Sequence, residues 1–281
     1  MKALAGTTWG HDMELLLQTY KSLIRSGFDY GSPIWFPNVS ATNLKQLQVV
    51  QNKALRIATG CHLKSSIAFL HTEAKILPVR NHLEMLNAQF LASAMRVTHP
   101  SHRVVTLPPG PRKMKKTLYE TSIPFVQQHL HNGVMKEISY KKAVKAIHLA
   151  AVAKSVCENG PNPLLGCYLY SNEPNASEQI LPRALRCTIR QLRSEKSVCL
   201  KSYLHSIGRA DDAICPLCRT STHTTRHLFE CPAYPTDLCI EDLWSHPPEV
   251  AAFLKTLPTF AHLPPVVLPP LPVPPEPPPL N

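Results

Sequence analysis

The sequence predicts a mainly α-helical protein: a helical bundle, then a basic helix with a small CCHC zinc knuckle, then a disordered proline-rich tail. Apolar residues recur at helical spacing in several stretches. The chain has 28 prolines and only 10 glycines, and the prolines mark the breaks between those stretches. Four Cys and His residues of the kind that bind zinc fall within residues 215–231.

We expect five segments along the chain. They are the helical bundle at 1–100, a basic proline-containing linker at 101–138, a helical segment with an arginine-rich helix at 139–210, the zinc knuckle at 211–246 and the proline-rich tail at 247–281. Because prolines dominate from residue 263 onward, the tail should be an extended polyproline II segment without a core.

The first predicted helix follows Asp12, a plausible N-cap, and stops at Gly27. The aromatic segment 30–37 is bounded by prolines and is too short for a helix. We expect its Trp35 and Phe36 to pack between helices.

Two more helices should complete the bundle. An apolar stripe over 44–58 ends at Gly60, a suitable C-terminal cap. Asn81 and Glu84 have the spacing of a capping box, so the third helix should begin near Asn81 and stop at Pro100. The polar face of the middle helix carries Lys45, Lys53 and Arg56.

A lysine-rich and alanine-rich helix should run over 139–157, and an arginine-rich helix should follow Pro182, a favoured first-turn residue. In the second of these, four arginines share one helical face: Arg183, Arg186, Arg190 and Arg193. Planar guanidinium groups in a row suit phosphate oxygens along a nucleic-acid backbone. The alternative is that these arginines only solvate an exposed face.

The zinc prediction rests on a C-x2-C-x8-H-x3-C array of Cys215, Cys218, His227 and Cys231. The first pair lies on one tight turn. His227 and Cys231 are one helical turn apart, on a short helix opened by residue 224 or 225. Four protein ligands leave no open coordination position, so the zinc ion should be structural.

Two alternatives to this ligand set stay open. The residues can be ordinary buried thiols with a chance histidine, and His223 and Cys239 are rival ligands. We prefer His227 because its spacing to Cys231 fits a helix, whereas His223 lies in a polar Ser/Thr stretch that looks like a loop.

The formal net charge of +11 and the pI near 9.3 favour a polyanionic partner, RNA or DNA first. The sequence shows no signal stretch and no apolar run long enough to span a bilayer, so we expect no membrane partner and a location in the nucleus or cytoplasm. The predicted nucleic-acid contacts are Arg183, Arg186, Arg190, Arg193, Lys196, Lys201, Arg219, Arg226, Lys53 and Arg56.

Catalytic motifs are not evident. Asp211 and Asp212 superficially resemble a polymerase aspartate pair, but they precede a zinc knuckle and no aromatic residue comes before them, so we reject a catalytic role. The sequence has no glycine-rich phosphate loop, no Gly-x-Ser-x-Gly elbow and no His-Glu-x-x-His helix.

Two blocks of the chain resemble non-LTR retrotransposon reverse transcriptases of the Jockey type. Tyr30-Gly-Ser-Pro-Ile-Trp35, the segment 47–60, Leu70-His-Thr-Glu73 and Leu77-Pro78 are similar to the region just after the polymerase core. Leu192-Arg-Ser194, Leu200-Lys-Ser-Tyr-Leu204, Ile207-Gly208 and the Cys215 to Cys231 array are similar to the carboxy-terminal zinc motif.

The resemblance implies that residues 11–100 are the thumb and adjoining helices, and that the zinc segment binds element RNA or target DNA. The family's fingers, palm and catalytic aspartates would precede Met1. The chain therefore resembles a truncated reverse transcriptase that binds nucleic acid without polymerising DNA.

Two other functions remain as alternatives. The first is a host-retained adaptor whose proline-rich tail recruits SH3 or WW domains and whose zinc knuckle binds protein. The second is an element remnant that is not expressed.

Overall fold

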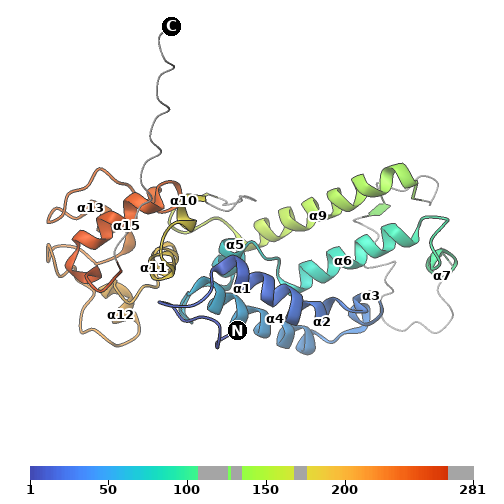
Figure 1. The fold of residues 1–281 in the computed structure, drawn as a ribbon, viewed down its shortest axis with the longest axis horizontal. Coiled ribbons are helices and arrows are strands. Elements are labelled where there is room, and N and C mark those ends of the chain that lie inside the picture. Colours follow the sequence, from blue (N-terminus) through green and yellow to red (C-terminus); the bar gives the residue numbers. More distant parts are fainter. Residues whose placement is uncertain (107–125, 128–134, 168–175, 265–281) are drawn as a thin grey trace, which may run out of the picture. The chain divides into compact units, whose positions relative to one another are not determined.

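The computed structural model describes residues 1–106, 126–127, 135–167 and 176–264 (Figure 1). The prediction of a mainly α-helical protein is confirmed for these residues, which form no β-strand and only two isolated bridges. The chain divides into two compact units, one of Met1–Gly6 with Gly10–Asn172 and one of Thr7–Trp9 with Glu173–Asn281. Most of the predicted basic linker, and residues 265–281 of the predicted tail, lie outside the described residues.

The first unit has ten helical elements among its described residues. They are α1 (Met13–Tyr20), η1 (Lys21–Arg25), α2 (Ser26–Asp29), α3 (Ser32–Trp35), η2 (Phe36–Asn38), α4 (Ala41–Thr59), α5 (Ile67–Ala74), α6 (Val79–Ala94), α7 (His102–Thr106) and α9 (Glu137–Asn159).

The first helix runs further than predicted. It begins after Asp12 as expected, but it continues from α1 through a π-helical turn, η1, into α2. Gly27 lies inside the helix with open space around it, whereas Gly31 takes a left-handed conformation with φ 62°. The helix therefore ends at Asp29, two residues beyond the predicted stop, and the glycine with a positive φ follows at position 31.

The aromatic segment 30–37 is also more regular than predicted, because it forms the short helices α3 and η2. The expected packing of Phe36 is confirmed: it is buried in a cluster with Leu44, Val79 and Leu83, which come from α4 and α6. Trp35 is partly buried against the same cluster. The backbone is helical here even though the segment is short, and Phe36 and Trp35 are the side chains that pack into the core.

Helix α4 confirms the second predicted helix. The hydroxyl of Ser40 caps its start by accepting a hydrogen bond from the Asn43 N–H, and Gly60 ends it at φ 73°. Helix α6 starts two residues earlier than predicted, with Pro78 as its N-cap. The Asn81 side chain does not cap it and instead donates to Glu158 Oε2 at 2.8 Å.

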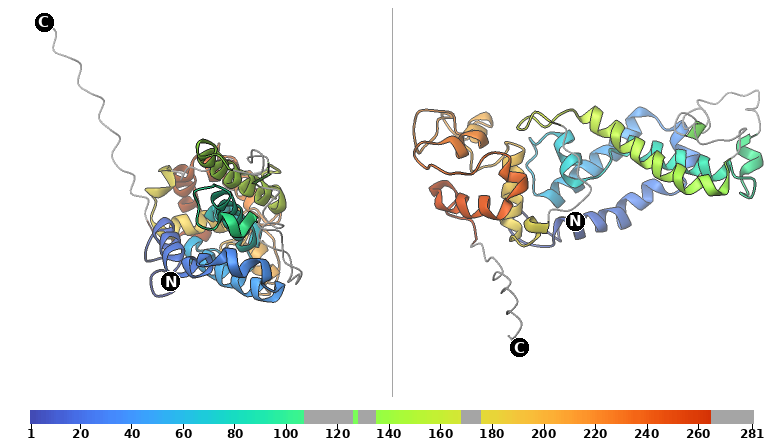
Figure 2. Two further views of the ribbon diagram at one scale, coloured as in Figure 1. Left: turned by 90° about the vertical axis from the view of Figure 1, so that its right-hand side faces the viewer. Right: turned by 90° about the horizontal axis from the view of Figure 1, so that it is seen from above.

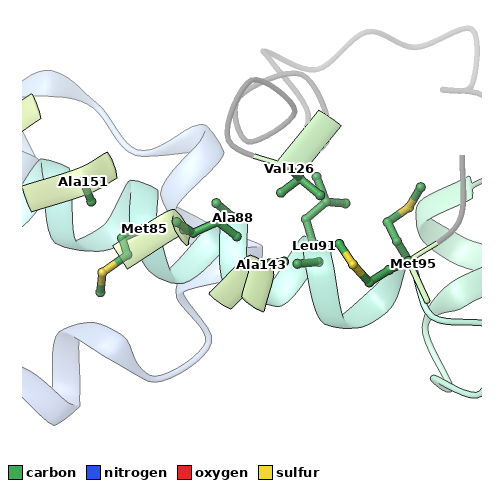
Figure 3. Close-up of a cluster of buried hydrophobic side chains, with 10 residues drawn as sticks. Met85, Ala88, Leu91, Met95, Val126, Ala143 and Ala151 are labelled. Atoms are coloured by element: carbon green, nitrogen blue, oxygen red, sulfur yellow. The ribbon is translucent and has the colours of Figure 1, made fainter. Parts of the chain in front are cut away.

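Helix α9 packs along α6 and forms a core of small and large apolar side chains (Figure 3). Ala143, Ile147 and Ala151 recur every four residues on the buried face of α9. They meet Met85, Ala88, Leu91 and Ala92 of α6, and the small alanines allow the two backbones to approach closely. Figure 2 shows α6 lying between α9 on one side and α4 on the other.

The second unit is built from shorter helices. They are α10 (Ala176–Gln179), α11 (Arg183–Arg193), α12 (Lys201–Ser206), α13 (Thr225–Glu230), α14 (Asp242–Ser245), α15 (Pro247–Thr256) and η4 (Pro258–Phe260). Helices α10, α11 and α14 pack against α15. The predicted helical segment 139–210 is thus divided, because α9 belongs to the first unit and α11 to the second.

Candidate metal centre and nucleic-acid contacts

A tight turn presents Cys215 and Cys218 to one point. The backbone closes into a narrow loop, with an antiparallel bridge between Ile214 and Thr222 and a hydrogen bond from the Cys215 N–H to the Ser221 carbonyl. The Arg219 N–H bonds back to the Cys215 carbonyl, and Arg219 itself takes φ 59°. The chain thus reverses within the loop and turns both thiols toward the same side.

Helix α13 supplies the other two ligand candidates. As predicted, Thr224 caps this helix, and its hydroxyl accepts the His227 N–H at 3.2 Å. His227 then lies in the first turn, and Cys231 is the residue that ends the helix. Their spacing of four residues places both side chains on the face that looks at the loop.

The structure brings the four ligand atoms together. The thiol sulfurs of Cys215, Cys218 and Cys231 and a ring nitrogen of His227 all lie within 4.8 Å of one another. Cys218 Sγ is 3.2 Å from His227 Nε2. Tetrahedral zinc with bonds of about 2.3 Å to sulfur and 2.0 Å to nitrogen would separate its ligand atoms by about 3.5–3.8 Å. The group is therefore close enough to hold a metal ion, and its chemistry is compatible with zinc.

Hydrogen bonds favour the thiolate form of one of these cysteines. Hydrogen bonds from the Thr220 hydroxyl, at 3.1 Å, and from its backbone N–H lower the pKa of Cys218 to about 6. Burial acts in the opposite direction on Cys231 and raises its pKa. The metal ligand is the thiolate, so Cys218 offers it more readily than Cys231 at neutral pH. No sequence pattern indicates this role of Thr220.

The two alternative ligands, His223 and Cys239, lie outside this group of four side chains. His223 is fully buried, but its Nδ1 accepts the backbone N–H of Lys201 at 3.0 Å and it is not among the four grouped residues. Cys239 is exposed, and its thiol donates to Asp242. The structure thus groups His227, and neither of these two residues, with the three cysteines.

The four arginines of α11 do not form the exposed row that the sequence predicted. Arg183, Arg186, Arg190 and Arg193 are all buried, with at most 6% of each residue exposed. Arg190 and Arg193 form salt bridges with the two carboxylate oxygens of Glu178 on α10. Arg193 also donates from Nε and Nη2 to the Leu243 carbonyl, at 3.0 and 2.6 Å, and its guanidinium lies 5.4 Å from the Trp244 ring centroid.

Glu178 is the residue that sequence reasoning missed. Burial alone would raise its pKa, but the neighbouring Arg193 and Arg190 outweigh burial and hold the pKa below its usual value. A buried carboxylate between guanidinium groups keeps its charge, and it allows α11 to bury a face that the sequence pattern placed in solvent. The partner lies just before the helix, which periodicity within the helix cannot reveal.

The remaining predicted contacts are dispersed. Lys201 is held by Asp212, with Nζ 2.7 and 2.9 Å from its carboxylate oxygens, so Asp212 anchors α12. Arg226 lies 3.9 Å from Glu230 on the exposed side of α13, Arg219 is exposed, and Lys196 is half-buried. In the first unit, Lys53 of α4 is exposed and Arg56 of the same helix is half-buried.

Charge is distributed unequally between the units. The described residues of the first unit contain sixteen Lys and Arg against seven Asp and Glu. The described residues 176–264 of the second unit contain ten against nine, and four of those ten are the buried arginines of α11. The excess of basic residues that was expected near the zinc array is therefore found among the described residues of the first unit.

The chain has no match among protein-family models, curated proteins or solved structures. Across the described ranges, none of the helices combines the length and the apolarity that a membrane crossing requires.

Proposed function

We propose that the chain is a non-catalytic nucleic-acid-binding part of a retrotransposon reverse transcriptase, with a structural zinc ion held by Cys215, Cys218, His227 and Cys231. The observation that carries the zinc proposal is the convergence of these four side chains from two local elements. Three thiolates and one imidazole form a closed tetrahedral set, which suits a structural rather than a catalytic ion.

The nucleic-acid proposal rests on the basic surface of the helical bundle. Lys45 and Lys53 are exposed two helical turns apart on α4, and the described residues of the first unit carry an excess of basic over acidic side chains. Such a surface attracts phosphates without reading bases. A zinc ion at the proposed site would stabilise the second unit, and the resemblance to retrotransposon enzymes suggests that this unit also binds RNA or DNA.

Metal analysis of the full chain tests the zinc proposal. We expect one zinc per chain in the wild type and a loss of zinc in both Cys218→Ser and His227→Ala. The control variants are Cys239→Ser and His246→Ala, whose side chains bond to Asp242 outside the cluster and should leave the zinc content unchanged. If the wild-type protein is produced in zinc-containing medium and the purified protein holds no zinc, the proposal is contradicted.

Salt-dependent binding tests the nucleic-acid proposal. Counterion release predicts that the affinity for a DNA duplex falls linearly with salt on a log–log plot, with a slope of about 0.9 per phosphate contact. The double variant Lys45→Gln/Lys53→Gln should flatten this slope, whereas Lys2→Gln/Lys64→Gln, which removes the same charge from two other exposed sites, should flatten it less. Absent or salt-independent binding by the wild type would refute this function.

A further inference from the structure

We infer that α9 provides a second phosphate-binding surface, separate from α4 and formed by Lys141, Lys142 and Lys145. We call it the α9 lysine surface. The inference rests on the proposed nucleic-acid function and specifies where that function is carried out.

The α9 lysine surface is the solvent side of a helix whose other side is fixed. Ala143 and Ile147 lie buried against α6, so the helix cannot rotate without losing this core. Lys141, Lys142 and Lys145 are all exposed, and Lys141 and Lys145 are one helical turn apart. Packing of the apolar side therefore holds three ammonium groups in solvent at one end of the helix.

The α9 lysine surface lies away from the carboxylates whose side chains the structure describes. Among those side chains, no Asp or Glu oxygen lies within salt-bridge distance of the three lysines. At the other end of α9, Lys154 contacts Glu84 at 2.7 Å and Glu158 at 4.0 Å. The same helix thus uses one lysine to hold α6 and leaves three facing solvent.

Like charges at this spacing cost stability. Pairs three or four residues apart on a helix repel by about 0.2–0.5 kcal/mol each. The cost is removed when an anion approaches, and one helical turn of about 5.4 Å places Lys141 and Lys145 within reach of consecutive backbone phosphates. Charge complementarity therefore identifies the occupant as the phosphate backbone of a nucleic acid.

The α9 lysine surface and the α4 surface are distinct. Helix α6 lies between the two helices (Figure 2), so α9 adds a contact region instead of extending the one on α4. A nucleic acid long enough to follow the first unit can use both, and their contributions to the salt dependence should then add.

The test is the salt slope of duplex-DNA binding by the full chain carrying Lys141→Gln, Lys142→Gln and Lys145→Gln. Glutamine keeps helix propensity, so α9 should remain folded. If all three lysines contact phosphates, the slope should fall by about 2.7, which is roughly 40-fold less change in affinity between 50 and 200 mM salt. Circular dichroism verifies that the helix content is kept.

The matched control is Lys2→Gln, Lys21→Gln and Lys64→Gln, which removes the same charge from three exposed lysines elsewhere in the first unit. A larger loss of slope in the α9 variant than in this control supports the inference. Equal slopes in the two variants overturn it while leaving the proposed function standing, whereas a wild type that does not bind DNA overturns both.

Discussion

Helices α9 and α11 carry similar numbers of basic residues and use them in opposite ways. In α9, three lysines face solvent and the apolar side is packed on α6. In α11, all four arginines are buried, and two of them share the carboxylate of Glu178. The comparison shows that helical spacing tells which basic residues share a face, while the charges on neighbouring elements decide whether that face is a surface.

The largest effect should come from removing the charge of Glu178. The substitution Glu178→Gln keeps the shape but leaves Arg190 and Arg193 buried without their carboxylate, which typically costs 3–5 kcal/mol. Urea unfolding of the second unit measures this loss. The control Glu230→Gln, at an exposed pair with Arg226, should change the free energy of unfolding by less than about 0.5 kcal/mol. Similar effects of the two substitutions would mean that the buried cluster contributes little.

Acid should weaken the same cluster. The pKa of Glu178 is lowered in the folded state, so its stabilising contribution is complete above the ordinary glutamate pKa of about 4.3 and is lost as pH falls through the lower folded-state value. The difference in unfolding free energy between wild type and Glu178→Gln should therefore be constant near neutral pH and shrink in acid. A difference that grew in acid would contradict the assigned direction of the pKa shift.

Arg193 should not be replaceable by lysine. Its guanidinium reaches Glu178, the Leu243 carbonyl and the face of Trp244 at once, and a single ammonium cannot make all these contacts. We expect Arg193→Lys to destabilise the second unit by about 1–3 kcal/mol, measured by the same unfolding experiment. The control is Arg219→Lys, at an exposed loop position. An equal loss of unfolding free energy at both sites would argue against a specific role of the planar guanidinium of Arg193.

The smallest effect should appear in α9. Lys145 lies three and four residues from Lys142 and Lys141, so Lys145→Gln should leave stability unchanged or raise it by up to about 0.5 kcal/mol at low salt. Added salt should remove the gain, because it screens the repulsion. A clear loss of stability would show that Lys145 makes a structural contact. Helix α9 would then use this basic residue as α11 uses its arginines.

Local signals predicted much of the fold. Gly60 at the end of α4 and Thr224 before α13 act as the helix caps that the sequence predicted. The grouping of the three cysteines with His227 was also predictable, because each pair is close in sequence and needs only a turn or a short helix. Gly27 shows the limit of such rules, since a glycine inside a helix and a glycine that ends one look alike until the tertiary packing is known.

The failures involve contacts between residues far apart in the chain or on different elements. Asn81 was predicted to cap α6 but bonds Glu158, which is 77 residues away. Arg190 and Arg193 were predicted to face solvent because Glu178 belongs to a separate short helix. In each case a polar side chain found a specific tertiary partner, and no pattern within a single helix contains that information.

The hydroxyl of Thr225 links helix α13 to the end of helix α11. Thr225, at the first position of α13, is fully buried and donates to the Leu192 carbonyl, which also accepts the Glu195 N–H. Both lone pairs of a carbonyl near the end of α11 are thus used, one of them by a residue of α13, the helix that carries His227. Amide hydrogens at the end of α11 should consequently exchange with solvent together with those of α13. If the proposed zinc ion is bound, its removal by a chelator should therefore accelerate exchange in a helix that contributes no ligand.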